Sequence, residues 1–263
     1  MKVFWQLNSY IRYYFRSKSR YVVHSPFAYR LIHDIFRDKS VYPELKKLDK
    51  AKKQLFKRTT AIETTDLGAG AGNKHYTTYI DTLGKIARQR SPRKKDLHIL
   101  FKLSRHFHPE YILEFGTSTG ISASYIGLAS PFKKFVSMEG CAVLAAHACE
   151  YFTELNLSGI EVKVGNFDVI LDKILDEFEQ LDFVFVDGNH RRQQTLDYFE
   201  RCLKKTHEFS IIIFDDIHWS TEMEEAWTII KKNKKVSVTF DLFNMGIVFF
   251  RNGIQKQDFI IRY

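Results

Sequence analysis

Short apolar runs alternate with helical segments from Tyr111 to the end of the chain. Runs of β-type residues separated by segments of helical periodicity are typical of βαβ units around a parallel sheet. The pattern predicts five such strands followed by an antiparallel hairpin: residues 111–114, 135–139, 161–164, 183–187 and 210–215, then 236–242 with 246–251. We therefore expect an α/β fold with a doubly wound, mostly parallel, seven-stranded sheet.

The first part of the chain has a different pattern, in which helices and irregular loops dominate. Pro26 after Ser25 is a plausible helix start, and apolar residues follow at helical spacing up to Phe36. Residues 44–58 predict a basic amphipathic helix, and residues 96–106 predict a helix that ends before Pro109. We expect two domains: a basic, mainly helical N-terminal extension or lid at residues 1–95, and the α/β domain at residues 96–263.

The charge of the chain is unevenly distributed. Its 263 residues are 44% hydrophobic and 27% charged, which is an ordinary globular composition and excludes a disordered or low-complexity chain. Residues 1–110 carry 24 Lys and Arg against 9 Asp and Glu, whereas residues 111–263 carry 16 against 22. The basic half is either a solvated surface that docks on the acidic half or a site for an anionic partner.

Several features bear on where the protein works. The three cysteines contain no C-x-x-C pair, which favours a reducing compartment. No apolar run approaches the roughly 20 residues of a membrane-spanning helix, and the first 20 residues lack the pattern of a secretory signal. We expect a cytoplasmic protein without a transmembrane segment.

A glycine turn follows the first predicted strand. Glu114, Gly116 and Gly120 bracket this turn, and a helix follows it. Glycines there allow backbone N–H groups to approach a ligand closely. The turn departs from G-x-G-x-x-G at Ser118, so a nicotinamide dinucleotide site is not indicated. The next strand ends in Glu139, at the distance where an acid can bind two ribose hydroxyls.

A second glycine-rich segment, Asp66 to Gly72, has three alternating glycines. Its lead-in contains few apolar residues, and no strand ending in an acid follows at a comparable distance. A glycine motif needs its strand and helix to indicate a phosphate or nucleotide site. We therefore interpret this segment as a flexible lid or entry loop.

Three aspartates follow the fourth and fifth predicted strands, Asp187 after the fourth and Asp215 and Asp216 after the fifth. Ligands of open α/β sheets bind outside the carboxyl ends of the strands. Like charges that meet there need a cation or a shared proton, and oxygen ligands suit Mg²⁺ or Ca²⁺. The sequence predicts a divalent metal site formed by these aspartates.

Five segments in this order resemble class I S-adenosylmethionine-dependent methyltransferases, specifically the catechol-type O-methyltransferase branch: EFGTSTGISASYIGLAS, VSMEG, VGNFDVIL, FVFVDGNH and IIIFDDIHWS. The resemblance covers about residues 100 to 253 and implies a Rossmann-like methyltransferase fold. A helical N-terminal extension with a D-x-G-A-G loop suggests a bacterial subgroup. The resemblance implies that the methionine part of the cofactor is surrounded by Glu114, Gly116, Thr117, Ser118 and Gly120. It further implies that Glu139 binds the ribose and that Asn166 and Phe167 flank the adenine.

The resemblance also implies roles around Asp187. It implies that Asp187 takes part in metal binding, cofactor binding and catalysis. Asp215-Asp216 stands where metal-dependent relatives have Asp-Asn. The catalytic Lys of the family's Asp-x-x-Lys is replaced by His190, which could accept the hydroxyl proton near neutral pH. His218 is the second candidate base, with Trp219 as a wall of the substrate site.

The predicted function is S-adenosylmethionine-dependent methyl transfer to a small-molecule hydroxyl, assisted by a divalent metal ion. Two alternatives stay open. The basic, aromatic-rich front half could serve a nucleic-acid methyltransferase, although no recognisable RNA-binding module appears. A non-catalytic binding protein could also use this fold for assembly or membrane-surface contact. The acceptor and the oligomeric state are left open by the sequence.

Overall fold

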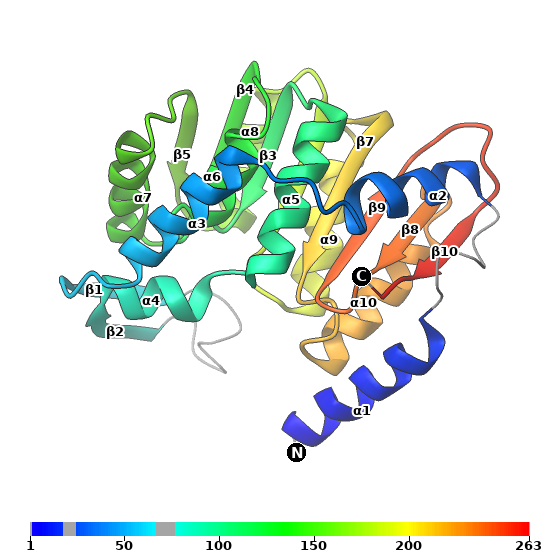
Figure 1. Cartoon of the computed structure of the whole chain (residues 1–263), viewed down its shortest axis with the longest axis horizontal. Coiled ribbons are helices and arrows are strands. Elements are labelled where there is room, and N and C mark those ends of the chain that lie inside the picture. Colours follow the sequence, from blue (N-terminus) through cyan, green and yellow to red (C-terminus); the bar gives the residue numbers. More distant parts are fainter. Residues whose placement is uncertain (1, 18–24, 67–76, 263) are drawn as a thin grey trace. The chain divides into compact units, whose positions relative to one another are not determined.

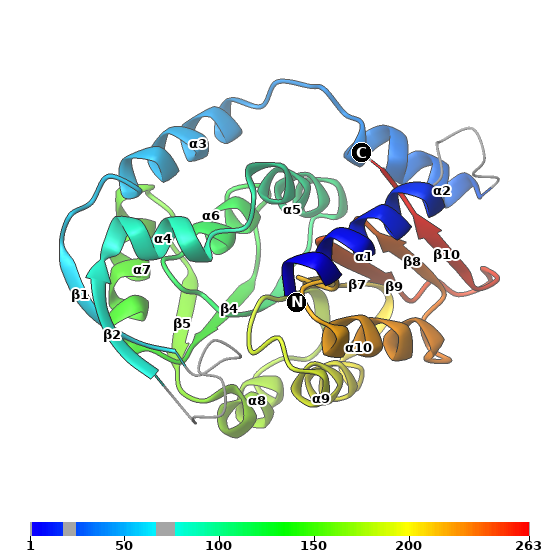
Figure 2. The same ribbon diagram turned by 90° about the horizontal axis from the view of Figure 1, so that it is seen from below.

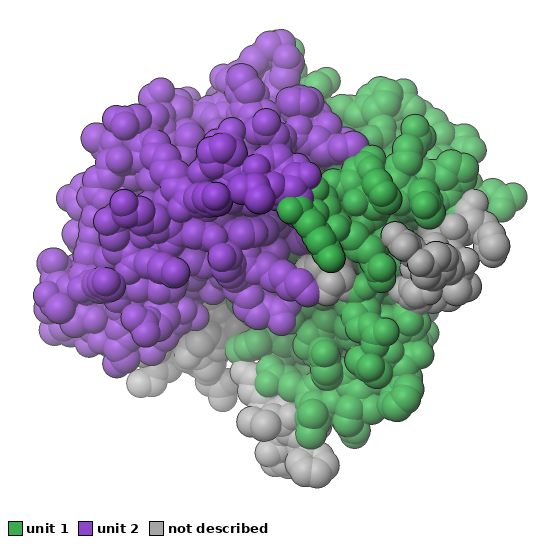
Figure 3. Space-filling model, viewed as in Figure 1, with its two compact units in different colours: residues 1–39, 179–263 green, residues 40–178 purple. Residues whose placement is uncertain are grey.

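The computed structural model describes residues 2–17, 25–66 and 77–262, and the chain divides into two compact units (Figure 3). Unit 1 contains residues 1–39 and 179–263, and unit 2 contains residues 40–178. Among the described residues, eight strands form one mostly parallel sheet, and two further strands form a separate antiparallel pair. The α/β, Rossmann-like fold class is therefore confirmed. The predicted domain division at residue 95 stays a prediction.

Unit 2 contains three parallel strands and a separate hairpin (Figure 1). The parallel strands are β3 (Tyr111–Phe115), β4 (Lys134–Glu139) and β5 (Ile160–Val164), and the antiparallel hairpin is β1 (Ala61–Asp66) and β2 (Thr77–Thr82). The helices are α3 (Pro43–Leu55), α4 (Leu83–Arg90), α5 (Lys94–Phe107), α6 (Ile121–Gly127), α7 (Ala142–Glu154) and α8 (Phe167–Asp176). Strand β3 is almost wholly buried, as expected for a parallel strand with helices on both faces.

Unit 1 contains five strands in the order β10-β8-β9-β7-β6. They are β6 (Leu181–Val186), β7 (Thr206–Asp215), β8 (Val238–Asp241), β9 (Met245–Phe249) and β10 (Gln257–Ile260). Strand β9 runs antiparallel to both of its neighbours, β7 and β8, so the predicted final hairpin is confirmed. The helices are α1 (Lys2–Arg16), α2 (Pro26–Leu31) with the π-helical turn η2 (Ile32–Phe36), α9 (Arg192–Cys202) and α10 (Thr221–Lys232).

Two N-terminal helices belong to the same unit as the C-terminal strands. Figure 2 shows α1 alongside these strands, where the Tyr13 hydroxyl donates to the carbonyl of Ile261. The predicted start of α2 is confirmed, since Ser25 Oγ accepts a hydrogen bond from the Ala28 N–H at 3.3 Å and Pro26 follows the cap. The described residues contain no helix of the length and apolarity that a bilayer crossing requires.

Two expectations about the elements were wrong. The predicted sheet had seven strands, and β10 is an additional strand that pairs parallel with β8. The segment before residue 95 was expected to be helical and irregular, yet β1 and β2 form a hairpin there. Threonines line both strands of that hairpin, and β-branched residues favour extended backbone. Most of the predicted lid loop, residues 67–72, lies outside the described residues.

Candidate active site

The turn after β3 is held against the end of β4 by backbone hydrogen bonds. The N–H groups of Gly116 and Thr117 donate to the Met138 carbonyl at 2.9 and 3.0 Å. Gly116, Ser118 and Gly120 have φ values of 94°, 47° and 79°, in the left-handed region that favours glycine. The chain can therefore turn sharply into α6 directly beside the last residue of β4.

Glu139, the last residue of β4, binds this turn. Its Oε2 accepts from the Ser118 N–H at 2.7 Å, and its Oε1 accepts from the Cys141 N–H at 2.9 Å. Burial raises the pKa of Glu139, and the N–H donors of Cys141 and Ser118 and the charge of Arg90 counteract that rise. The structure thus brings together the turn and the acid that the sequence predicted as a pair.

Glu114 lies below the turn and is fully buried. Ser137 Oγ donates to Glu114 Oε2, and the hydroxyl of Ser137 also hydrogen bonds to the hydroxyl of Thr117. A chain of polar groups therefore connects β3, β4 and the turn. These contacts give Glu114 and Thr117 a role in holding the turn in place, beside the cofactor contacts that the resemblance implies for them.

The end of β5 lies next to Glu139, because the Gly165 N–H donates to the Glu139 carbonyl at 2.9 Å. Asn166 follows and caps α8, with its Oδ1 accepting from the Asp168 N–H at 2.9 Å. Phe167 is half-buried, and its ring packs edge-on against the ring of Phe115 with centroids 5.9 Å apart. Both residues thus stand at the edge where Glu139 lies, and each also has a structural role.

Gly120 is required by packing inside the protein. A Cβ atom there would lie 2.7 Å from Cε1 of Phe152, in addition to the strain of its positive φ. We expect Gly120→Ala to lower the free energy of unfolding by about 2 to 4 kcal/mol, measured by urea denaturation. Gly253→Ala is the matched control, because Gly253 has φ +71° and nothing within 4 Å of the added Cβ, and it should cost only about 1 kcal/mol. Equal losses for the two variants would contradict the packing explanation.

The hairpin β1–β2 contributes residues that the sequence analysis did not assign to this region. Thr64 Oγ1 donates to the Cys141 sulfur at 3.7 Å, next to the N–H that binds Glu139. Arg90, whose guanidinium donates to the Tyr79 hydroxyl at 3.1 Å, acts electrostatically on Glu139. The threonine-rich flanks of the Asp66 loop were the sequence signal for this hairpin.

Asp187 and Asp215 occupy corresponding positions on neighbouring strands of unit 1. The register pairs Val186 of β6 with Phe214 of β7, and each aspartate is the next residue. Asp215 is buried, and Asp216 follows with a left-handed φ of 55°. The structure therefore places these carboxylates at one edge of the unit 1 strands, as the sequence predicted.

His190 lies beside Asp187, with Nε2 3.5 Å from the carboxylate Oδ1. Asn189 and His190 both have positive φ, 68° and 45°, and the Asn189 amide donates to the buried Tyr198 hydroxyl at 3.1 Å. The ring of Trp219 packs near His190 with centroids 5.9 Å apart. Non-glycine residues in this backbone region cost energy and cluster at functional sites, so the loop is a candidate catalytic segment.

The predicted metal site is not supported by this geometry. No group of three or more His, Cys, Asp or Glu residues in the described part of the chain is arranged to hold a metal ion. Asp187, Asp215 and Asp216 thus do not form a ligand set as they stand. Their role as ligands of Mg²⁺ or Ca²⁺ stays a prediction.

His218 is held between two carboxylates. Its Nδ1 lies 2.7 Å from Glu224 Oε1 and its Nε2 lies 2.9 Å from Asp241 Oδ2, while its ring stacks on Phe243. Burial lowers the pKa of His218, but the hydrogen bonds to Asp241 and Glu224 outweigh burial and raise it to about 9. A protonated imidazole with both nitrogens engaged cannot accept a proton near neutral pH, which leaves His190 as the better candidate base.

The raised pKa of His218 predicts a pH-dependent stability. Because the pKa of the folded protein, about 9, exceeds the ordinary 6.5, the stabilisation is complete below 6.5 and is lost as pH rises through about 9. We expect His218→Gln to cost about 3 kcal/mol near pH 6 and progressively less at higher pH, as measured by urea denaturation. His33→Gln removes a surface histidine with a carboxylate at 2.8 Å and should change little. A His218→Gln cost that does not vary with pH would contradict the assignment.

The fold and the turn are those of a Rossmann-like α/β domain, and comparisons with known proteins show what this domain resembles. Residues 113–217 match the model of a family described as a methyltransferase domain. This part of the chain, less than half of its length, is therefore similar to a methyltransferase domain. A comparison with curated protein sequences finds no significant match.

Several solved structures share the fold at low sequence identity. The methyltransferase PaMTH1 from Podospora anserina, bound to S-adenosylhomocysteine, has 12% identity and a TM-score of 0.58, with 88% of this chain and 97% of that chain covered. An O-methyltransferase from Bacillus cereus in complex with S-adenosylhomocysteine has 18% identity and a TM-score of 0.55, covering 84% and 96%. TomG from Streptomyces achromogenes, an O-methyltransferase of tomaymycin synthesis in complex with S-adenosylmethionine, has 17% identity and a TM-score of 0.56, covering 81% and 92%.

Proposed function

We propose that this protein is an S-adenosylmethionine-dependent methyltransferase that transfers a methyl group to the oxygen of a small-molecule hydroxyl. The observation that carries the proposal is the contact between the Glu139 carboxylate and the Ser118 N–H in the glycine turn. A buried carboxylate beside a tight glycine turn suits a ligand that has both ribose hydroxyls and a compact charged portion. The match of residues 113–217 to a family described as a methyltransferase domain supports the same cofactor.

The cofactor supplies a methyl group that is already activated on a sulfonium. The chain therefore has to bind the cofactor and the acceptor, orient them, and remove one proton from the acceptor. When the cofactor is bound, Glu139 would accept hydrogen bonds from the ribose hydroxyls, and Asn166 and Phe167 would flank the adenine. His190 accepts the proton of the acceptor hydroxyl through its imidazole. The Asp187 carboxylate, 3.5 Å from Nε2 of His190, stabilises the imidazolium that forms.

The proposal is tested by calorimetric titration with S-adenosylhomocysteine, followed by transfer of labelled methyl groups to a panel of phenols, alcohols, amines and RNA. We expect binding of S-adenosylhomocysteine and labelled ethers from hydroxyl acceptors. Absence of binding would contradict the cofactor, and labelling of RNA or amines alone would contradict the acceptor class. Repeating the assay after chelation and re-addition of Mg²⁺ or Ca²⁺ tests the metal prediction separately.

A further inference from the structure

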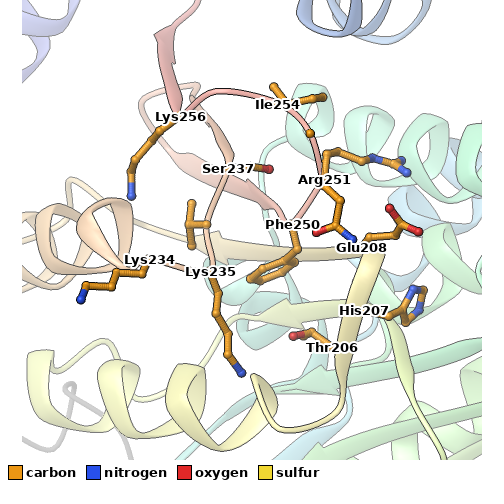
Figure 4. Close-up of a pocket in the computed structure, with 13 residues that line it drawn as sticks. Thr206, His207, Glu208, Lys234, Lys235, Ser237, Phe250, Arg251, Ile254 and Lys256 are labelled. Atoms are coloured by element: carbon orange, nitrogen blue, oxygen red, sulfur yellow. The ribbon is translucent and has the colours of Figure 1, made fainter.

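Unit 1 contains a cavity of about 490 Å³ at the edge opposite to Asp215. It is lined by residues 206–208 at the start of β7, 234–237 before β8, and 250–254 with Lys256 between β9 and β10 (Figure 4). Strand β7 runs for ten residues from Thr206 to Asp215. The cavity at its start is therefore about 30 Å from Asp215 at its end. The cavity therefore has no part in the proposed methyl transfer.

The lining of this cavity is strongly basic. It carries four cationic side chains, Lys234, Lys235, Arg251 and Lys256, and one carboxylate, Glu208. Figure 4 shows the three lysines on one side of Phe250, with Arg251 and Glu208 on the other. One acid cannot neutralise four cations, so the cavity has a positive potential that favours an anion with several charges.

Three of the four cations are held in place by residues of unit 1 that are distant in sequence. The ammonium of Lys256 donates to the Asn233 carbonyl at 2.8 Å, and that of Lys235 donates to the Leu203 carbonyl at 3.5 Å. An ammonium has three N–H donors, so one such bond leaves two for a ligand. The Arg251 guanidinium lies over the rings of Phe209 and Phe27, 4.8 and 5.3 Å from their centroids. These contacts restrict the cationic side chains before a ligand binds, so that less side-chain conformational entropy is lost on binding.

We propose that this cavity binds a small anionic ligand that carries two or more phosphate groups. Lysine ammoniums act as point charges toward phosphate oxygens, and the planar guanidinium can donate two parallel hydrogen bonds to one phosphate. A volume of about 490 Å³ lies within the range of small-molecule sites, roughly 300 to 1,000 Å³. The four cations match the charge of a diphosphate or triphosphate better than that of a single carboxylate.

The proposal is tested by calorimetric titration of the full chain with inorganic tripolyphosphate and ADP at low ionic strength. We expect binding that weakens at least about tenfold in Lys234→Ala/Lys256→Ala, because two charge-assisted contacts are lost. Lys46→Ala/Lys50→Ala removes the same charge from exposed positions of α3 and should leave the affinity unchanged. Lys234→Gln alone retains the Lys256 contact to Asn233, so it should weaken binding without the stability loss that the double variant could carry.

The outcomes separate the sources of the phosphate and the competing explanations. Tighter binding of ADP than of tripolyphosphate supports a nucleotide ligand, and the reverse supports an inorganic polyphosphate. No binding to the unmodified protein overturns the proposal, as does an equal loss in Lys46→Ala/Lys50→Ala. Binding of a single-stranded oligonucleotide without binding of either small phosphate also overturns it and indicates a nucleic-acid surface instead.

Discussion

Glu139→Ala is expected to weaken the binding of S-adenosylhomocysteine by about 100- to 10,000-fold. The proposed site gives the two ribose hydroxyls one shared charged acceptor, and each hydrogen bond to a charged group contributes about 1.5 to 3 kcal/mol. Glu139 is only 7% exposed. Water therefore replaces the lost hydrogen bonds to the ribose poorly when the carboxylate is removed. Calorimetric titration of the unmodified protein and the variant measures the change directly.

A matched acid on the neighbouring strand provides the control for this experiment. Glu161 of β5 is exposed and paired with Lys163 at 3.1 Å, so Glu161→Ala removes a carboxylate without touching the turn. Glu139→Gln keeps an acceptor for the Ser118 N–H and should bind more tightly than Glu139→Ala while remaining weaker than the unmodified protein. Glu139→Ala with unchanged affinity and an unchanged melting temperature would refute the cofactor site.

The pairing of the turn with Glu139 could be predicted from sequence because it depends on a local rule. Carboxyl ends of parallel strands meet at one edge, so the residues after Phe115 and at the end of β4 had to approach each other. The same rule predicted the common edge of Asp187 and Asp215. The alternation of strands and helices along the chain and the periodicity of the helices were clear enough to indicate the fold class without tertiary information.

Other features depend on partners that are distant in sequence and could not be predicted. Gly120 is glycine partly because of the Phe152 ring, 32 positions later in the chain, which no local pattern reveals. The charge of His218 depends on Asp241, whose position follows from the packing of β8. Strand β10 has only two apolar residues in four and pairs on one side alone, so its sequence signal was weak.

The second large effect is expected at His190. His190→Gln should lower kcat for the hydroxyl acceptor found in the screen by about 100- to 10,000-fold, the usual contribution of a general base. Any rise of kcat with pH that deprotonation of His190 causes should disappear as well, because glutamine does not titrate.

The affinity for S-adenosylhomocysteine should stay the same in His190→Gln, because Glu139 and the turn are unchanged. An unchanged affinity shows that a lower kcat reflects loss of the base and not misfolding. Asp187→Asn retains the imidazole but removes the carboxylate 3.5 Å from it, so kcat should fall by a smaller factor with the pH limb still present. His33→Gln, which changes a surface histidine in the same unit, should retain full activity. An undiminished kcat in His190→Gln would show that another group accepts the hydroxyl proton. The positive φ values of Asn189 and His190 would then have a cause other than catalysis.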